Sequence, residues 1–167
     1  LPQRKDVESV WDICANAVLA EDGTICGLGA RDTLRTEMGY PLHGHELSLE
    51  ISPVQASATW AIGWKKGAFH GSNVLVAQKS EGPARRMRGL KSNDRGIPRA
   101  GMALQDESGK VVGTVTSGTF SPTLRVGIAL ALVDTNLSIG DHVSIDIRGR
   151  ASSATIVEFP FVPSHVR

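Results

Sequence analysis

Apolar residues recur at helical spacing near the start of the chain and predict an amphipathic helix there. The positions that form this stripe are Val7, Val10, Trp11, Cys14 and Val18. Asp6 is a suitable N-cap before the stripe, and the acidic and glycine residues at 21–23 are typical of a helix end. A second helix is predicted over residues 31–38, with Gly39 as its C-terminal glycine.

Two more helices are predicted before residue 82. Ser52 followed by Pro53 is typical of an N-cap and the first residue of a helix. The segment that this pair opens carries Trp60 and Trp64, which we expect to lie in the core, because tryptophan is highly buried on average. Residues 71–78 are expected to form one more short helix.

After Gly82 and Pro83 the pattern changes from helices to short strands. Strands are expected at residues 102–104, 111–115, 127–133, 142–148 and 154–161. A hairpin turn at 106–109 joins the first two, and the alternation of polar and apolar residues at 142–148 indicates a half-buried strand. Five or six short strands with Gly and Pro turns predict a small antiparallel barrel or sandwich, so the fold class is α+β.

The composition is that of a folded protein rather than of a disordered or membrane-spanning one. Hydrophobic residues make up 41% of the 167 residues, and no apolar run is long enough to span a bilayer. The formal net charge is +1, which gives no reason to expect binding to nucleic acid or to a membrane surface. The first residues lack the apolar core of a signal peptide and an initiator Met, so we expect a processed, truncated or fragmentary chain.

One local cluster of basic residues, Arg85, Arg86 and Arg88, stands out from this balanced charge. It is compatible with a solvated strand or with a docking patch, and we favour the solvated strand. Cys14 and Cys26 do not make a disulfide framework. Their apolar neighbours predict buried thiols in a reducing compartment, which favours a cytoplasmic protein.

The chain has no strong motif for a metal or a nucleophile. Residues 43–46 have the sequence His-Gly-His-Glu, but without the HExxH spacing or an evident third ligand, so we expect a loop there. The sequence contains no CxxC pair for zinc and no GxSxG elbow for a nucleophilic serine. We therefore assign no catalytic residue and no metal ligand to this chain.

A glycine-rich stretch at residues 27–32, GLGARD, is a weak signal for phosphate binding. It lacks the full GxGxxG pattern and the strand that precedes it in dinucleotide-binding units. Arg31 lies at the start of the second predicted helix, and its planar guanidinium suits a carboxylate partner. From the residues alone, a structural ion pair of Arg31 with Asp32, Glu37 or a distant carboxylate is the favoured interpretation.

Several segments, in the same order along the chain, together resemble the glycine cleavage T-protein family. Residues 27–35 (GLGARDTLR) and 41–46 are similar to its central signature, and residues 113–118 and 121–124 to its barrel motif. Shorter matches at 88–90, 98–101, 128–130 and 160–162 extend the resemblance to nearly the whole chain. Two positions depart from the pattern, since Thr36 replaces a usual leucine and His43 a common tyrosine.

The resemblance implies a division of the chain into two parts. Residues 1–82 would be a helical segment of an incomplete folate-binding domain, and residues 83–167 a C-terminal antiparallel β-barrel that begins near Arg85. Arg31 matches an arginine of the family's folate pocket, and Tyr40 and Trp60 match positions that line it. The family's catalytic aspartate and its pterin-binding glutamate would precede Leu1, so this chain alone is expected to be inactive.

The resemblance also implies an activity, a cofactor and a partner. The family transfers a methylene unit from the aminomethyl-lipoyl arm of the H-protein to tetrahydrofolate, and ammonia is released. The nearest enzyme alternative is the folate-binding part of a sarcosine- or dimethylglycine-oxidising enzyme. The non-enzyme alternative is a folate-binding or partner-binding module, a class that includes iron–sulfur assembly proteins of the same fold. The full GLGARDTLR signature favours the T-protein.

Overall fold

The computed structural model describes residues 2–147 and 149–164, and the chain divides into two compact units, one up to Asp32 and one from Thr33 onwards. The first unit contains the 3-10 helix η1 (Arg4–Asp6), the helix α1 (Val7–Ala20) and the start of α2 (Leu28–Glu37). The second contains the end of α2, the 3-10 helix η2 (Thr59–Ala61), the helix α3 (Ser72–Glu81) and all the strands. Within the described ranges, no helix has the length and apolar character needed to cross a membrane.

The helix α1 forms where the apolar spacing predicts it. Asp6 occupies the N-cap position as expected, but its side chain makes no capping hydrogen bond. No residue of α1 is buried, and Trp11 remains exposed. Both Cys14 and Cys26 are free and exposed, so the expectation of buried thiols is wrong. The physical reason is that no other element of the first unit covers the apolar stripe of this helix.

The second helix, α2, begins three residues earlier than predicted and ends one residue earlier, at Glu37. Gly39 has a φ of +68°, the left-handed conformation that favours glycine. Its N–H donates to the carbonyl of Thr36, and the next N–H, that of Tyr40, donates to the carbonyl of Arg35 at 2.8 Å. This pair of bonds is a Schellman motif, which satisfies carbonyl groups that the helix end leaves free.

The helix predicted from Ser52 is reduced to a single turn. Ser52 and Gln55 exchange hydrogen bonds: the Ser52 hydroxyl accepts from the Gln55 N–H at 3.2 Å, and the Gln55 side chain accepts from the Ser52 N–H at 3.0 Å. This is a capping box, the start of a helix. Ser57 then adopts a positive φ of 58°, which no helix interior accepts, and the chain turns away. The fourth predicted helix is confirmed as α3.

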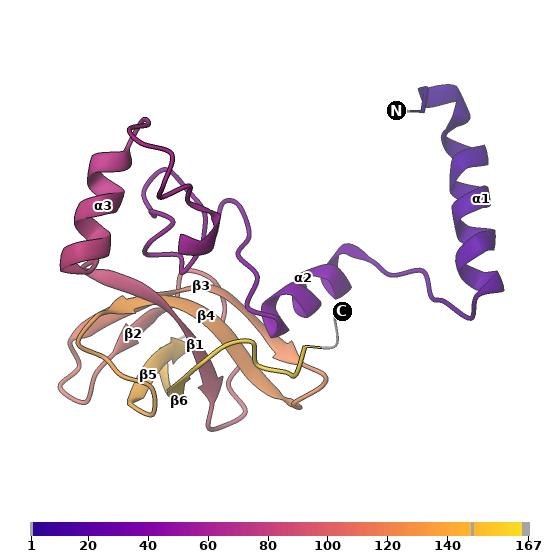
Figure 1. The fold of residues 1–167 in the computed structure, drawn as a ribbon. Coiled ribbons are helices and arrows are strands. Elements are labelled where there is room, and N and C mark those ends of the chain that lie inside the picture. Colours follow the sequence, from indigo (N-terminus) through magenta and orange to yellow (C-terminus); the bar gives the residue numbers. More distant parts are fainter. Residues whose placement is uncertain (1, 148, 165–167) are drawn as a thin grey trace. The chain divides into compact units, whose positions relative to one another are not determined.

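The strands close into an antiparallel barrel, as predicted, and the α+β fold class is confirmed (Figure 1). The six strands are β1 (Arg85–Ser92), β2 (Ala103–Gln105), β3 (Val111–Ser121), β4 (Val126–Asp134), β5 (His142–Ile147) and β6 (Arg150–Val157). Their order around the barrel is β1-β4-β3-β2-β5-β6, which is a closed circle. The last strand starts four residues before the predicted one and ends before Phe161.

The barrel interior is filled by small and branched apolar side chains from all six strands. On β4, Ala129, Ala131 and Val133 belong to this core, and Ile128 and Leu130, which point to the other face, are also buried. The outer face of the barrel is therefore covered as well. The N–H of Met87 on β1 donates to the carbonyl of Gln55 at 2.8 Å, so the irregular segment after α2 lies against the outside of the barrel.

We expect Gly39→Ala to destabilise the second unit more than Gly44→Ala does. Both glycines have positive φ, so the backbone strain of an alanine is shared by the two variants. A Cβ on Gly39 would lie 2.8 Å from Cγ of the Phe159 ring, whereas one on Gly44 would meet nothing within 4 Å. Overpacking costs about 1–3 kcal/mol, so the unfolding free energies should differ by about that amount in urea titrations. Equal unfolding free energies for Gly39→Ala and Gly44→Ala would contradict the close approach of Gly39 to the Phe159 ring.

Candidate functional site

The structure places the three predicted folate-binding residues in exposed positions. Arg31 lies exposed in the first turn of α2, within the unit that ends at Asp32. Tyr40 and Trp60 belong to the second unit, where their residues are 53% and 86% exposed. The expectation that Trp60 lies in the core is therefore wrong. A single exposed aromatic ring is ordinary on a protein surface, so the exposure of Trp60 does not by itself indicate a ligand.

Of the partners considered for Arg31, Glu37 has other partners in the structure. The carboxylate of Glu37 is instead engaged by Ser121 and Thr123 at the end of β3. Among the described residues, no ion pair involves Arg31. The role of Arg31 in folate binding stays a prediction from the resemblance.

Trp60 and Trp64 differ in how firmly they are held. The indole N–H of Trp64 donates to the carbonyl of Thr59 at 3.0 Å, and the Lys79 ammonium lies 4.2 Å from the centre of its ring. The ring of Trp64 is thus half-buried and fixed by a hydrogen bond and a cation–π contact. Trp60, in η2, is left as the exposed aromatic face of this segment.

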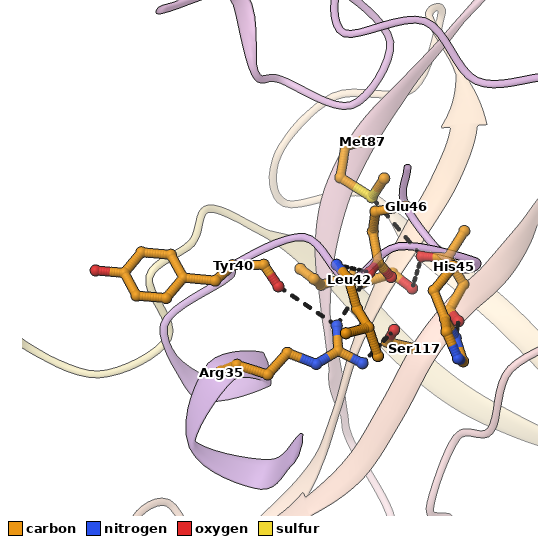
Figure 2. Close-up of polar contacts among 9 residues, drawn as sticks. Arg35, Tyr40, Leu42, His45, Glu46, Met87 and Ser117 are labelled. Atoms are coloured by element: carbon orange, nitrogen blue, oxygen red, sulfur yellow. Dashed lines mark hydrogen bonds and ion pairs between the residues drawn. The ribbon is translucent and has the colours of Figure 1, made fainter. Parts of the chain in front are cut away.

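Tyr40 is held through its backbone, which leaves its phenol ring outside. Its N–H bonds the carbonyl of Arg35, and Nη1 of Arg35 donates to the Tyr40 carbonyl at 3.4 Å. Figure 2 shows the Tyr40 ring directed away from the polar groups that hold its backbone. The position of the ring is therefore set by Arg35 rather than by packing of the ring itself.

A buried ion pair lies at the centre of this arrangement. Arg35 Nη1 and Glu46 Oε2 are 3.0 Å apart, and the two residues are 8% and 0% exposed. Nη2 of Arg35 donates to the hydroxyl of Ser117 on β3 at 2.7 Å. Oε2 of Glu46 also accepts the N–H of Leu42 at 3.0 Å (Figure 2). One guanidinium thus joins α2, the loop at residues 40–46 and the barrel.

The loop at residues 43–46 makes a second bond to the same strand. Nδ1 of His45 lies 2.7 Å from the carbonyl of Thr116, so it is the protonated nitrogen that donates. The Thr116 hydroxyl in turn donates to the carbonyl of Leu130 at 3.0 Å. The segment is a loop, as expected. Within the described ranges, no group of three metal-binding side chains is present.

A second buried carboxylate, Glu37, fixes the turn between β3 and β4. The Ser121 hydroxyl donates to its Oε1, and the Thr123 hydroxyl donates to its Oε2 at 3.1 Å. The Ser121 oxygen also accepts the N–H of Leu124 at 3.0 Å. Glu37 is engaged through both oxygens, whereas Glu46 is engaged through Oε2 and its buried Oε1 has no partner among the described residues; neither carboxylate is assigned a catalytic role.

Analysis of the sequence missed these partnerships. Arg35 and Glu46 entered the sequence analysis only as part of the central signature, Glu37 as a candidate partner of Arg31, and Ser117 and Ser121 as part of the barrel motif. The structure shows that each segment supplies the bonding partners of the other. The family pattern contains polar residues in both segments, and buried polar groups need hydrogen-bond partners. The available signal was therefore that the two polar segments could bond each other.

Comparison with known families agrees with the fold and with these motifs. Residues 85–163 match the family model of the glycine cleavage T-protein C-terminal barrel domain, and residues 2–66 match that of the GCVT N-terminal domain. A crystal structure of glycine cleavage system aminomethyltransferase T from Bartonella henselae superposes with a TM-score of 0.79 at 34% identity, over 89% of this chain and 44% of that one. The class defined is thus a T-protein barrel preceded by part of its N-terminal domain.

Two relatives carry the same name. The aminomethyltransferase of Parafrankia sp. (strain EAN1pec) is 56% identical over 167 residues, and that of Mycobacterium avium (strain 104) is 53% identical over 169 residues. Each alignment covers 100% of this chain and 46% of the relative, so the chain spans about half the length of the curated relatives it matches. The chain belongs to the glycine cleavage T-protein family, as the resemblance indicated.

Proposed function

We propose that this chain is part of an aminomethyltransferase that passes a methylene unit from the aminomethyl-lipoyl H-protein to tetrahydrofolate. The observation that carries the proposal is the 56% identity, along the whole chain, to an aminomethyltransferase. In the reaction, the carbon–sulfur and carbon–nitrogen bonds of the aminomethyl thioether break, and two bonds to folate nitrogens form. The two protons of those nitrogens leave with the thiol and with ammonia, so no oxidant is needed.

The residues present fit the binding of a folate. A folate offers a flat ring system and carboxylates, which suit exposed aromatic faces and a free guanidinium respectively. Tyr40 and Trp60 supply the aromatic faces, and Arg31 supplies the guanidinium. We assign these residues to binding and positioning of tetrahydrofolate, and we place the enzyme in the cytoplasm, because its free Cys14 and Cys26 suit a reducing compartment.

The division of the chain into a folate-binding part at residues 1–82 and a barrel at 83–167 is part of this proposal. It differs from the division into compact units, which falls after Asp32. Hydrogen bonds of Arg35 and Glu37 hold the barrel to the segment that precedes it. This segment therefore belongs to the compact unit of the barrel, although the family pattern assigns it to the folate-binding part.

Arg31→Ala in the complete enzyme should weaken tetrahydrofolate binding roughly tenfold or more and leave the unfolding midpoint unchanged. A hydrogen bond to a charged group contributes about 1.5–3 kcal/mol, which corresponds to that loss of affinity. Because Arg31 is exposed and forms no ion pair within the described residues, its removal should cost little stability. Titration calorimetry with tetrahydrofolate measures the first quantity and thermal unfolding the second.

Arg4→Ala is the matched control, because Arg4 is an exposed arginine of the same unit with no assigned role. Arg31→Lys keeps the charge and loses the planar guanidinium, so its affinity for tetrahydrofolate should lie between those of the wild type and Arg31→Ala. Unchanged folate affinity together with a lowered unfolding midpoint would show that Arg31 is structural and would remove it from the site.

A further inference from the structure

The basic cluster at the start of β1 divides into two kinds of arginine. Nε of Arg85 lies 2.9 Å from the Asp134 carboxylate on the neighbouring strand β4, and both side chains are partly exposed. This is an ordinary pair on a solvated strand, as the sequence led us to expect. Arg86 and Arg88 are placed differently.

The strand register puts Arg86 and Arg88 on the inner face of the barrel. Residues directly opposite each other in an antiparallel pair point to the same face. Arg88 lies opposite Ala131 and Arg86 opposite Val133, and both of these β4 residues belong to the barrel core. Two guanidinium groups therefore extend from the lining of the barrel, at the end where β1 begins.

Neither arginine is fully paired there. Nε of Arg86 and Nε of Arg88 are both buried and have no hydrogen-bond acceptor among the described residues. Nη1 of Arg88 donates to the carbonyl of Met87 at 3.4 Å. Arg85, one residue away on the opposite face, satisfies its Nε with Asp134, so lack of an acceptor is specific to the inward pair.

The charges around this pair do not cancel. Burial lowers the pKa of Arg88, and the positive charge of Arg86 lowers it further, while Glu158 acts in the opposite direction. Glu158 is exposed, and no ion pair joins it to either arginine in the described part of the chain. The positive charges of Arg86 and Arg88 are therefore not balanced by an ion pair among the described residues, and a buried N–H without an acceptor is unfavourable.

We propose that Arg86 and Arg88 form a binding site for an oxyanion at this end of the barrel. Residues two apart on one strand lie about 7 Å from each other, so one anion with two or more oxygens reaches both guanidinium groups. Guanidinium forks bind carboxylates and phosphates through paired N–H donors. The ligand is therefore a carboxylate or a phosphate group on a small molecule or a partner.

The test is titration of the chain with inorganic phosphate and, separately, with succinate, at constant ionic strength set by chloride. We expect saturable binding of at least one of them, and a loss of at least tenfold in that affinity in Arg88→Met. Arg85→Met should bind as the wild type does, because Arg85 is already paired with Asp134. Binding of phosphate alone would identify a phosphate ligand, and binding of succinate alone a carboxylate ligand.

Thermal unfolding without added anion distinguishes a lost site from a lost fold. Methionine keeps most of the apolar stem and removes an uncompensated charge, so Arg88→Met should unfold at the same temperature as the wild type or higher. With the anion added, the wild type should unfold at the higher temperature of the two proteins, because the anion binds and stabilises only the wild type. No saturable binding of either anion, or equal affinity in Arg88→Met, would overturn the proposal, as would a lower unfolding temperature of that variant without anion.

Discussion

A protein made of residues 1–167 alone should form no methylenetetrahydrofolate above the uncatalysed background. The residues that we propose for this chain would only bind or position folate, and the buried carboxylates Glu37 and Glu46 accept hydrogen bonds from internal donors, Glu46 through Oε2. The resemblance places the aspartate that polarises the attacking nitrogen before Leu1. Loss of one electrostatic group costs about 10²–10³ in rate, and loss of positioning removes further orders of magnitude.

The measurement supplies the chain with lipoylated H-protein, glycine decarboxylase and tetrahydrofolate and follows methylenetetrahydrofolate. The full-length Parafrankia relative, 56% identical to this chain, is the positive control. Circular dichroism must show that the chain is folded, because an unfolded sample would also be inactive. Turnover comparable to that of the relative would mean that the essential chemistry lies within these residues, and that the assignment of the aspartate to an upstream segment is wrong.

Glu46→Ala should lower the unfolding free energy of the second unit by about 3–5 kcal/mol, the cost of breaking a buried ion pair by removing one partner. The variant leaves the Arg35 guanidinium buried without its carboxylate and removes the acceptor of the Leu42 N–H. Loop residues 40–46 should loosen as a result, and the exposed ring of Tyr40 should lose its fixed position. Urea unfolding measures the first effect and hydrogen exchange of the loop amides the second.

Asp134→Ala is the matched control, because it breaks the partly exposed pair with Arg85, for which about 0–1 kcal/mol is expected. The double variant Arg35→Met/Glu46→Leu should be more stable than Glu46→Ala, since no uncompensated charge remains. A cost for Glu46→Ala no larger than that for Asp134→Ala would show that the buried pair does not hold the loop to the barrel.

The sequence by itself determined the elements whose cause is local. Helix α1 follows from apolar spacing, the end of α2 from a glycine that accepts positive φ, and the β2–β3 hairpin from its turn residues. The strand pattern predicted an antiparallel barrel or sandwich, because short alternating strands bury their apolar faces only against one another, and the resemblance indicated the barrel that the structure shows. The candidate site residues Arg31, Tyr40 and Trp60 came from resemblance, and their roles stay predictions.

Only the tertiary structure decided which polar residues meet and which apolar residues stay outside. Arg35 and Ser117 are far apart in sequence, and no local pattern indicates that one guanidinium joins them to Glu46. The helix expected from Ser52 stops after one turn, because Ser57 turns the backbone while Gln55 bonds the barrel. Alternation along β1 separates Arg85 from Arg86, but the closed register decides that Arg86 faces the core. Burial and pairing depend on contacts between distant segments, whereas periodicity and turn chemistry act within a few residues.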